Sequence, residues 1–228
     1  ISGSTFAHCN SLSSITIPES VTSIGENAFY NCKALKNITL PDNITTIERG
    51  TFEYCSALTS ITIPNKVTTI KERAFADCSA LNRVVVGKVV SKIYSDDYWD
   101  NSFYGCSNLK KVINYSKLDL YAGRDEYGCV AYYADKVLNM RDGEIVDNFF
   151  FSKYNACLEG CIEDNAELIL PQDYKGQKYD IGAYAFRNSD LTSIEIPDGV
   201  ESVESYTFYN CTSLSSVKFS SGLKRIGG

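Results

Sequence analysis

The sequence has little of what catalytic and metal-binding sites are usually built from. Its 228 residues include a single histidine, His8, with one methionine and one tryptophan. A histidine-based metal site or an activated nucleophile needs a second group nearby, and the chain has no second histidine. No glycine-rich phosphate loop or nucleophile motif accompanies the scattered carboxylates. We therefore expect no catalytic residue, no bound metal and no cofactor.

Two further absences argue against particular classes of binding partner. The sequence has no apolar run of about 18 residues, the length that membrane-spanning helices need, so no membrane insertion is expected. It also lacks an excess of basic residues, because 22 Lys and Arg stand against 28 Asp and Glu for a net charge of -6. Nucleic acids and anionic membranes attract basic surfaces. Neither is therefore an expected partner.

What the sequence does contain is an internal repeat with a step of 23 residues. The matching columns include Phe6, Phe29, Phe52 and Phe75, then Cys9, Cys32, Cys55 and Cys78, then Leu12, Leu35, Leu58 and Leu81, and then Pro18, Pro41 and Pro64. The pattern resumes at Phe103 after a five-residue insertion and returns in the last third of the chain. So many columns with one step predict a stack of repeated structural units.

The physical chemistry of one unit indicates a short strand followed by a turn. Ile15 and Ile17 alternate with polar residues and are β-branched, which suits a strand, and Pro18 ends it. Phe29 belongs to a compact turn or a single turn of 3₁₀ helix. One unit cannot bury its own apolar edge, whereas stacked units share a core. We therefore expect a parallel sheet, and Phe52 fully buried between Phe29 and Phe75.

The repeat resembles the BspA-like group of leucine-rich repeats, the LRR_5 type. Its unit reads roughly L-x-x-I-x-I-P-x-x-V-x-x-I-G-x-x-A-F-x-x-C, and residues 24–46 and 47–69 match it nearly column for column. The resemblance implies a leucine-rich-repeat solenoid, a right-handed curved β-solenoid with short strands in a parallel sheet and short 3₁₀ or turn segments. It also implies a secreted or surface-displayed bacterial protein, of a group linked to adhesion and protein binding.

The repeats divide the chain into a first block, 1–114, an island, 115–161, and a second block, 162–228. Both ends fall in mid-repeat, which predicts a piece of a longer protein. Within the island, apolar residues between Tyr127 and Asn139 are spaced as on one helix face and predict a short helix. The segments 149–151, 157–158 and 168–170 predict strands of a small meander. This α+β island either only carries the stack onward or also contributes to binding.

The cysteines give one firm expectation and one open question. Six of the nine share one repeat column, and buried, reduced thiols that pack as small hydrophobic groups are expected there. An odd total argues against a complete disulfide framework. Cys157 and Cys161 lie outside the column, where a disulfide between them is one alternative. A zinc site is a weaker one, because the paired ligand spacing is missing.

Candidate binding residues come from the insertion and from the outward strand positions. Tyr98 and Trp99 lie in the insertion among three aspartates, and aromatic residues on loops often anchor ligands. The alternatives are a solvated loop whose Trp99 covers the core, or a Ca²⁺ site without an EF-hand-like loop. The outward strand positions form a hydroxyl ladder that includes Thr39 and Thr62, and they then change to Arg83 and Lys111. That ladder is either a binding face or a solvated face with high β-propensity.

These observations predict a non-enzymatic cell-surface or secreted interaction module. Adhesion to a protein or glycan ligand outside the cell, through the solenoid face or the insertion loop, is the leading hypothesis. The alternative is a structural spacer that holds other domains of the parent chain, which would then carry recognition. A hydrolase is a distant third hypothesis, because the sequence has no catalytic constellation.

Overall fold

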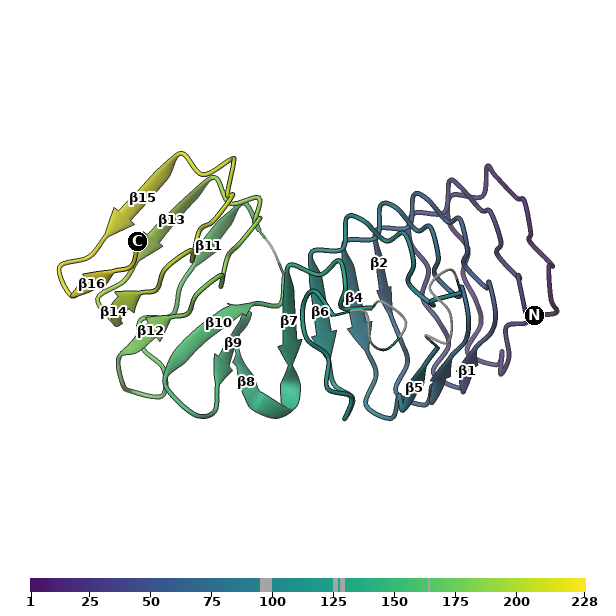
Figure 1. The fold of residues 1–228 in the computed structure, drawn as a ribbon, viewed down its shortest axis with the longest axis horizontal. Coiled ribbons are helices and arrows are strands. Elements are labelled where there is room, and N and C mark those ends of the chain that lie inside the picture. The colour runs from purple at the N-terminus through teal and green to yellow at the C-terminus, as the bar shows by residue number, and fades with distance from the viewer. Residues whose placement is uncertain (95–99, 125–126, 128–129, 164) are drawn as a thin grey trace. The chain divides into compact units, whose positions relative to one another are not determined.

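A computed structural model describes residues 1–94, 100–124, 127, 130–163 and 165–228. The chain forms two compact units, unit 1 over residues 1–139 and unit 2 over residues 140–228. The boundary between them falls inside the segment 115–161. Each unit is a stack of short coils of chain (Figure 1), so the predicted solenoid is confirmed.

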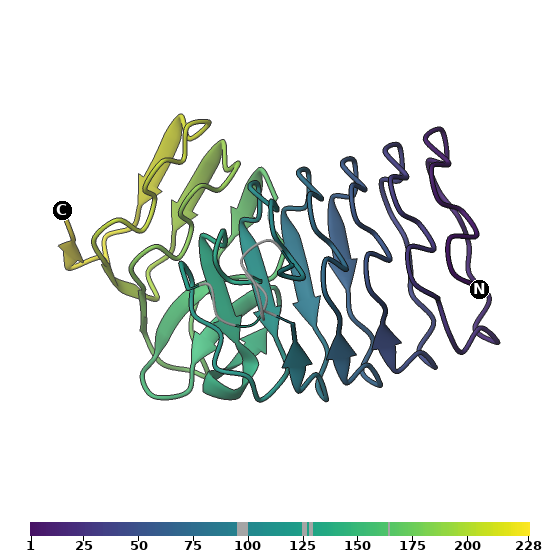
Figure 2. The same ribbon diagram turned by 45° about the vertical axis from the view of Figure 1, so that its right-hand side comes forward.

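Unit 1 carries two parallel sheets on different sides of its coils (Figure 2). The larger sheet has the order β2-β4-β6-β7, with β2 at Ser60–Thr62, β4 at Arg83–Val86, β6 at Lys111–Asn114 and β7 at Lys136–Asn139. The smaller has the order β1-β3-β5, with β1 at Thr46–Ile47, β3 at Thr69–Ile70 and β5 at Lys92–Ile93. Ser60 pairs with Arg83 and Ile61 with Val84, so residues of one repeat column lie side by side. The strand position and its parallel pairing are therefore as the repeat predicts.

The phenylalanine column forms the centre of the core in unit 1. Successive rings lie parallel, with centroids 5.4 Å apart for Phe29 and Phe52 and 5.3 Å apart for Phe52 and Phe75. All three side chains are fully buried. The expected burial of Phe52 between its two neighbours is confirmed.

Each coil turns past this column through residues with left-handed backbone. We call this side of the stack the turn edge, and it comprises residues 27–31, 50–54 and 73–77 in unit 1 and residues 184–188 and 206–210 in unit 2. Two positions per coil have φ near +60°, for example Asn27 at 55° and Asn31 at 60°. Asparagine and glycine tolerate this region best. The N–H of Phe29 donates to the Thr51 carbonyl of the next coil at 2.9 Å, which ties the turns together.

The cysteine column has a hydrogen-bonding role beside its packing role. The thiols of Cys32, Cys55 and Cys78 donate to the phenylalanine carbonyl of the preceding coil at 3.1, 3.2 and 3.1 Å. These three thiols are buried, and burial raises the pKa of Cys55 to about 12 and that of Cys78 well above its ordinary value. A thiol held as a neutral donor is a poor nucleophile. The expected burial of the column is thus supported at these positions, but it is wrong for Cys9, which is exposed in the first coil, and only partly met by the half-buried Cys211.

Site-resolved alkylation tests this account of the cysteine column. In the native protein, iodoacetamide should label the exposed Cys9 readily, and Cys55 and Cys78 slower by at least about 10³-fold, because labelling needs local unfolding. Peptide mass spectrometry of timed samples gives the rates. In concentrated urea the three rates should converge. Rapid native labelling of Cys55 would contradict its burial.

The predicted helix within residues 127–139 is wrong. Residues 130–135 form turns and bends, and Lys136–Asn139 is strand β7, which pairs in parallel with β6. Val137 lies opposite Val112 and Leu138 opposite Ile113, so the segment completes another coil. Its apolar spacing fitted a helix, but the available edge of β6 and the β-branched Val137 favour strand pairing over local propensity.

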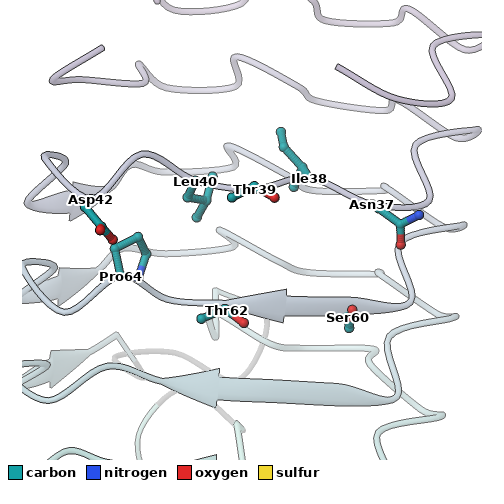
Figure 3. A pocket seen from close by; sticks show the side chains of 8 residues that line it. All are labelled: Asn37, Ile38, Thr39, Leu40, Asp42, Ser60, Thr62 and Pro64. Atoms are coloured by element: carbon teal, nitrogen blue, oxygen red, sulfur yellow. The ribbon is translucent and has the colours of Figure 1, made fainter. Parts of the chain in front are cut away.

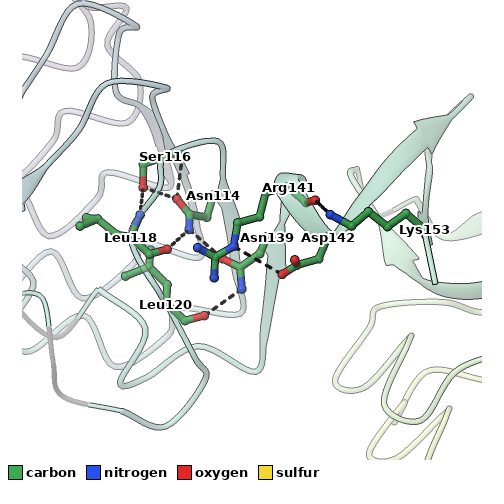
Figure 4. A network of polar contacts seen from close by, with 8 residues as sticks. All are labelled: Asn114, Ser116, Leu118, Leu120, Asn139, Arg141, Asp142 and Lys153. Carbon is green, nitrogen blue, oxygen red and sulfur yellow. Dashed lines mark hydrogen bonds and ion pairs between the residues drawn. The ribbon is translucent and has the colours of Figure 1, made fainter.

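A buried amide network holds this coil in place (Figure 4). Asn114 is fully buried, and its Nδ2 donates to the Leu118 carbonyl at 2.9 Å and to Oδ1 of Asn139 at 2.7 Å. Its Oδ1 accepts from the backbone N–H and the hydroxyl of Ser116 at 3.0 and 2.6 Å. Asn139 Nδ2 donates in turn to the Leu120 carbonyl at 3.0 Å. Each Asn114 group is satisfied, so the segment 116–120 is fixed against the coil.

Unit 2 begins with a short 3₁₀ helix, η1 at Met140–Asp142, and contains two sheets. The mixed sheet has the order β16-β14-β12-β10-β9-β8. Its strands are β8 at Gly143–Val146, β9 at Phe149–Ser152, β10 at Cys157–Cys161, β12 at Tyr179–Ile181, β14 at Val200–Val203 and β16 at Arg225–Ile226. The parallel sheet β11-β13-β15 spans Glu167–Ile169, Ser193–Ile196 and Ser216–Phe219. The predicted strands near 149–151 and 157–158 are confirmed as the antiparallel pair β9 and β10. The third segment of the predicted meander is also a strand, β11, but it pairs in parallel with β13 in the other sheet.

A disulfide between Cys157 and Cys161 does not fit unit 2. Both residues are buried in strand β10, one at each end. Four residues of extended chain separate their Cα atoms by about 13 Å, and a disulfide needs less than about 7 Å. The four-residue spacing of Cys157 and Cys161 therefore reflects two buried positions on one strand and not a disulfide.

Candidate functional site

The candidate site is the outward face of the larger sheet in unit 1. Side chains alternate along each strand, so Ile61 is buried while its neighbour Thr62 is exposed. Thr39 occupies the same column one coil earlier and is also exposed. Both threonines thus present their hydroxyls to solvent, as the ladder predicts.

A hollow of about 410 Å³ lies on this face between the coil of Thr39 and strand β2 (Figure 3). Its lining residues are Asn37, Ile38, Thr39, Leu40, Asp42, Ser60, Thr62 and Pro64. Strand β2 is the first strand of its sheet, and residues 37–40 are not part of a strand. The hollow therefore lies where the strand pairing stops. It combines apolar walls with hydroxyl, amide and carboxylate groups.

A second hollow of about 190 Å³ continues the first one along the strand ends. The two share Asp42, Thr62 and Pro64, and the second reaches Tyr115, whose side chain is exposed. Lys88 also lines it. Together the hollows form a shallow trough, which we call the strand-face trough. Its only charged lining residues among those described are Asp42 and Lys88.

Some polar side chains beside the trough form hydrogen bonds between successive coils. The side chain of Glu19 accepts from the Asp42 backbone N–H at 3.2 Å, and that of Asn65 accepts from the Lys88 N–H at 3.1 Å. Each bond joins the turn after a repeat proline to the corresponding turn of the next coil. These groups stabilise the edge of the trough.

The other candidate residues lie in different settings. Arg83 is half-buried on β4, and its buried Nε has no hydrogen bond to any residue that the structure describes. Lys111 is 7% exposed, so it presents little surface to a ligand. Tyr98 and Trp99 lie outside the described residues. Of the candidate residues, Thr39 and Thr62 are the two that the structure brings together around one hollow.

The turn edge of unit 1 holds a charged cluster with a structural role. Arg73 Nε and Nη2 donate to Glu53 Oε1 at 2.8 and 2.6 Å, and Glu53 is 7% exposed. The hydrogen bond that Arg73 donates to Glu53 raises the pKa of Arg73. Burial raises the pKa of Asp77, which lies 3.6 Å from Arg73. The pair of Arg73 and Glu53 joins the turns of two successive coils.

Histidine and acidic residues do not converge elsewhere in the described chain. His8 lies on the turn edge side of the first coil with φ of 62°, and its Nδ1 is 3.0 Å from Nδ2 of Asn31. Across residues 1–94, 100–124, 127, 130–163 and 165–228, no three His, Cys, Asp or Glu gather as a metal site would require. In the same ranges no helix is long and apolar enough to span a membrane.

The reading of apolar columns missed a cluster of exposed tyrosines on the turn edge of unit 2. Tyr184 and Tyr206 stack with centroids 5.3 Å apart and an interplanar angle of 4°. Tyr209 meets Tyr206 edge-on at 6.1 Å, and the Arg187 guanidinium lies 5.6 Å from the rings of both Tyr184 and Tyr209. The sequence signal for this cluster was tyrosine in a column where coils of unit 1 have serine, asparagine, glycine or arginine.

Comparison with known proteins identifies the repeat. The sequence profile described as BspA type leucine rich repeat region matches six copies, over residues 1–110 and 179–228. These ranges cover well over half of the chain. No curated protein sequence matches it.

Several solved bacterial structures resemble the chain. A leucine rich repeat protein from T. pallidum is 19% identical with a TM-score of 0.44, covering 100% of this chain and 65% of that one. A leucine rich cell surface protein from Faecalibacterium prausnitzii is 24% identical with a TM-score of 0.33, covering 98% and 65%. The pneumococcal vaccine antigen PcpA is 18% identical with a TM-score of 0.39, covering 94% and 58%. The chain thus spans less than two thirds of each of these proteins.

Proposed function

The chain belongs to the BspA-type leucine-rich repeat family, and from this premise we propose that it is a non-enzymatic adhesion module outside the cell. Its partner is a protein that docks on the strand-face trough of unit 1. The extracellular location follows from the family resemblance. Repeat solenoids generally bind through their extended sheet surfaces.

The observation that carries this proposal is the hollow between residues 37–40 and β2, at the edge of the sheet. The 410 Å³ hollow there is within the range of ligand-binding clefts. Ile38 and Leu40 line it beside the hydroxyls of Thr39 and Thr62. Such a lining suits an amphipathic side chain, such as a tyrosine from a partner, with an apolar body and a polar tip. Anchors of this kind dominate protein interfaces.

Filling the hollow tests the proposal. The exposed Thr62 should tolerate Thr62→Arg without loss of fold, while the long charged side chain occupies the space that a partner needs. On an immobilised panel of extracellular-matrix proteins and matrix glycans, we expect a protein to bind and the variant to weaken that binding by at least about tenfold. Surface plasmon resonance gives the dissociation constants.

The matched control is Thr45→Arg, because Thr45 is exposed beside β1 in the smaller sheet. This variant should bind like the unaltered protein. Saturable binding that Thr62→Arg leaves unchanged would exclude the trough. If only matrix glycans bind, the partner class is wrong, and if nothing binds, a structural spacer becomes the better hypothesis.

A further inference from the structure

The outward face of the larger sheet in unit 1 differs in charge from the rest of the chain. The column that contains Ser60 continues in register with Arg83 of β4, Lys111 of β6 and Lys136 of β7. The second outward column, which begins at Thr62, continues with apolar residues. The outward positions of these four strands therefore carry positive charges and no negative charge, although the net charge of the whole chain is -6.

Arg83 is the cation of this column whose side chain no polar contact holds in place. It forms no hydrogen bond or ion pair with any residue that the structure describes, and its Nε is buried. Lys111 and Lys136, by contrast, each have an interaction partner. On the turn edge, the Arg73 guanidinium is fixed by two hydrogen bonds to Glu53. The half-buried Arg83 side chain lacks such a restraint, so it can turn toward a ligand at little cost.

Arg83 lies next to the larger hollow of the strand-face trough. Ser60 lines that hollow and is the in-register neighbour of Arg83, and neighbouring strands lie about 4.8 Å apart. Ser60 lies at one end of the hollow and Asp42 at the other (Figure 3). Lys88 occupies the same repeat column as Asp42, two coils further on, so these opposite charges offset each other. An anion is therefore attracted to the Arg83 end of the hollow.

The chemistry that fits this end is a carboxylate beside an aromatic ring. The N–H groups of a guanidinium form a fork that matches the two oxygens of a carboxylate. The aromatic anchor proposed above occupies the hollow, and an extended chain advances about 3.3 Å per residue. A carboxylate one or two positions from that anchor therefore reaches Arg83.

We propose that Arg83 binds an aspartate or glutamate side chain that lies one or two residues from the aromatic anchor of the partner protein. This inference rests on the proposed docking of a protein in the trough, and it adds the charge of the docked segment. The trough then selects an acidic segment with an aromatic residue over neutral and basic segments. Because Arg83 is near the surface, added salt weakens this selection.

The test titrates the full chain with three capped peptides, in which one tyrosine is followed by two glutamates, two glutamines or two lysines between glycines. NMR shifts give the dissociation constants. We expect the glutamate peptide to bind at least about threefold more tightly than the glutamine peptide, and the lysine peptide to bind most weakly. In Arg83→Gln the preference for glutamate should disappear while the glutamine peptide binds as before. Arg83→Lys keeps the charge and should retain part of the preference.

Arg49→Gln is the matched control, since Arg49 is exposed between β1 and the turn edge and its loss changes the net charge equally. This variant should keep the preference for glutamate. Thr62→Arg should weaken binding of the glutamine peptide, because its tyrosine loses the hollow. The two sets of variants therefore separate the carboxylate contact from the aromatic anchor. Circular dichroism checks that each variant keeps the fold.

Four outcomes would overturn this inference. Equal affinity for the glutamate and glutamine peptides would remove the role of Arg83 and leave the trough as a docking site. A preference that survives Arg83→Gln would place the carboxylate contact elsewhere. Binding of heparin and of no peptide, lost in Arg83→Gln, would show that the anion belongs to a glycan. The last is no binding at about 10 mM peptide, a concentration that detects millimolar affinity; Thr62→Arg on the matrix panel then decides separately whether a whole protein docks in the trough.

Discussion

Phe52→Ala should lower the free energy of unfolding of unit 1 by about 3–5 kcal/mol, the usual cost of removing a buried aromatic ring. Phe52 is fully buried and stacks on both sides, 5.4 Å from Phe29 and 5.3 Å from Phe75. Its removal loses transfer free energy, leaves a cavity and deprives two other rings of a partner. Urea denaturation followed by circular dichroism measures the change.

Phe6→Ala is the matched control within the same column. Phe6 is half-buried and stacks on Phe29 at 5.2 Å. Because less of its surface is buried, we expect a cost below that of Phe52→Ala, about 1–2 kcal/mol. A cost for Phe52→Ala under about 1 kcal/mol, typical of surface positions, would show that the column does not form the core.

The sequence was sufficient for the core because the same or a similar apolar residue type fills each core column. Phenylalanine, cysteine and leucine recur with one step, and a solenoid places such residues in contact between coils. Parallel pairing of the strands follows from the same step. The hydroxyl ladder was predictable for the same reason, since alternation along a strand separates Ile61 from Thr62.

The hollow was not predictable, because it depends on where the pairing of equivalent strands stops. Residues 37–39 and 60–62 have nearly the same sequence, yet the second segment is strand β2 and the first is not part of a strand. The tyrosine cluster was missed for a different reason. The apolar columns identify the residues of the core. Tyr184 and Tyr206 instead lie at positions with left-handed backbone, and only the backbone angles show this.

The wrong helix prediction shows that apolar spacing alone does not distinguish a short helix from a strand. Val137 and Leu138 fit a helix face and a strand equally well, and short segments are ambiguous in this respect. Beside the available edge of β6, the buried Asn114 also favours the strand. It lies in register with Val86 of β4 on one side and with Asn139 of β7 on the other. A polar residue in an apolar column needs partners, and the segment after β6 supplies them.

Asn114→Ala should therefore be strongly destabilising, by about 3 kcal/mol. The Leu118 carbonyl, the Ser116 hydroxyl and N–H, and the Asn139 amide would lose a partner. A buried group left without its hydrogen bond costs about 1–3 kcal/mol, and such networks weaken together. Thermal and urea denaturation give the loss in stability. Hydrogen exchange should show faster opening of residues 136–139, since β7 depends on this network for its position.

Asn108→Ala separates this effect from the loss of an ordinary asparagine contact. Asn108 is exposed, and its Nδ2 donates to the Ser79 carbonyl at 2.7 Å. Water replaces such a bond, so a cost within about 0.5–1 kcal/mol is expected. Equal costs for the two variants would mean that Asn114 does not hold β7. A large cost confined to Asn114, with exchange accelerated in β7, would show that one buried amide converts the segment after β6 into a further coil.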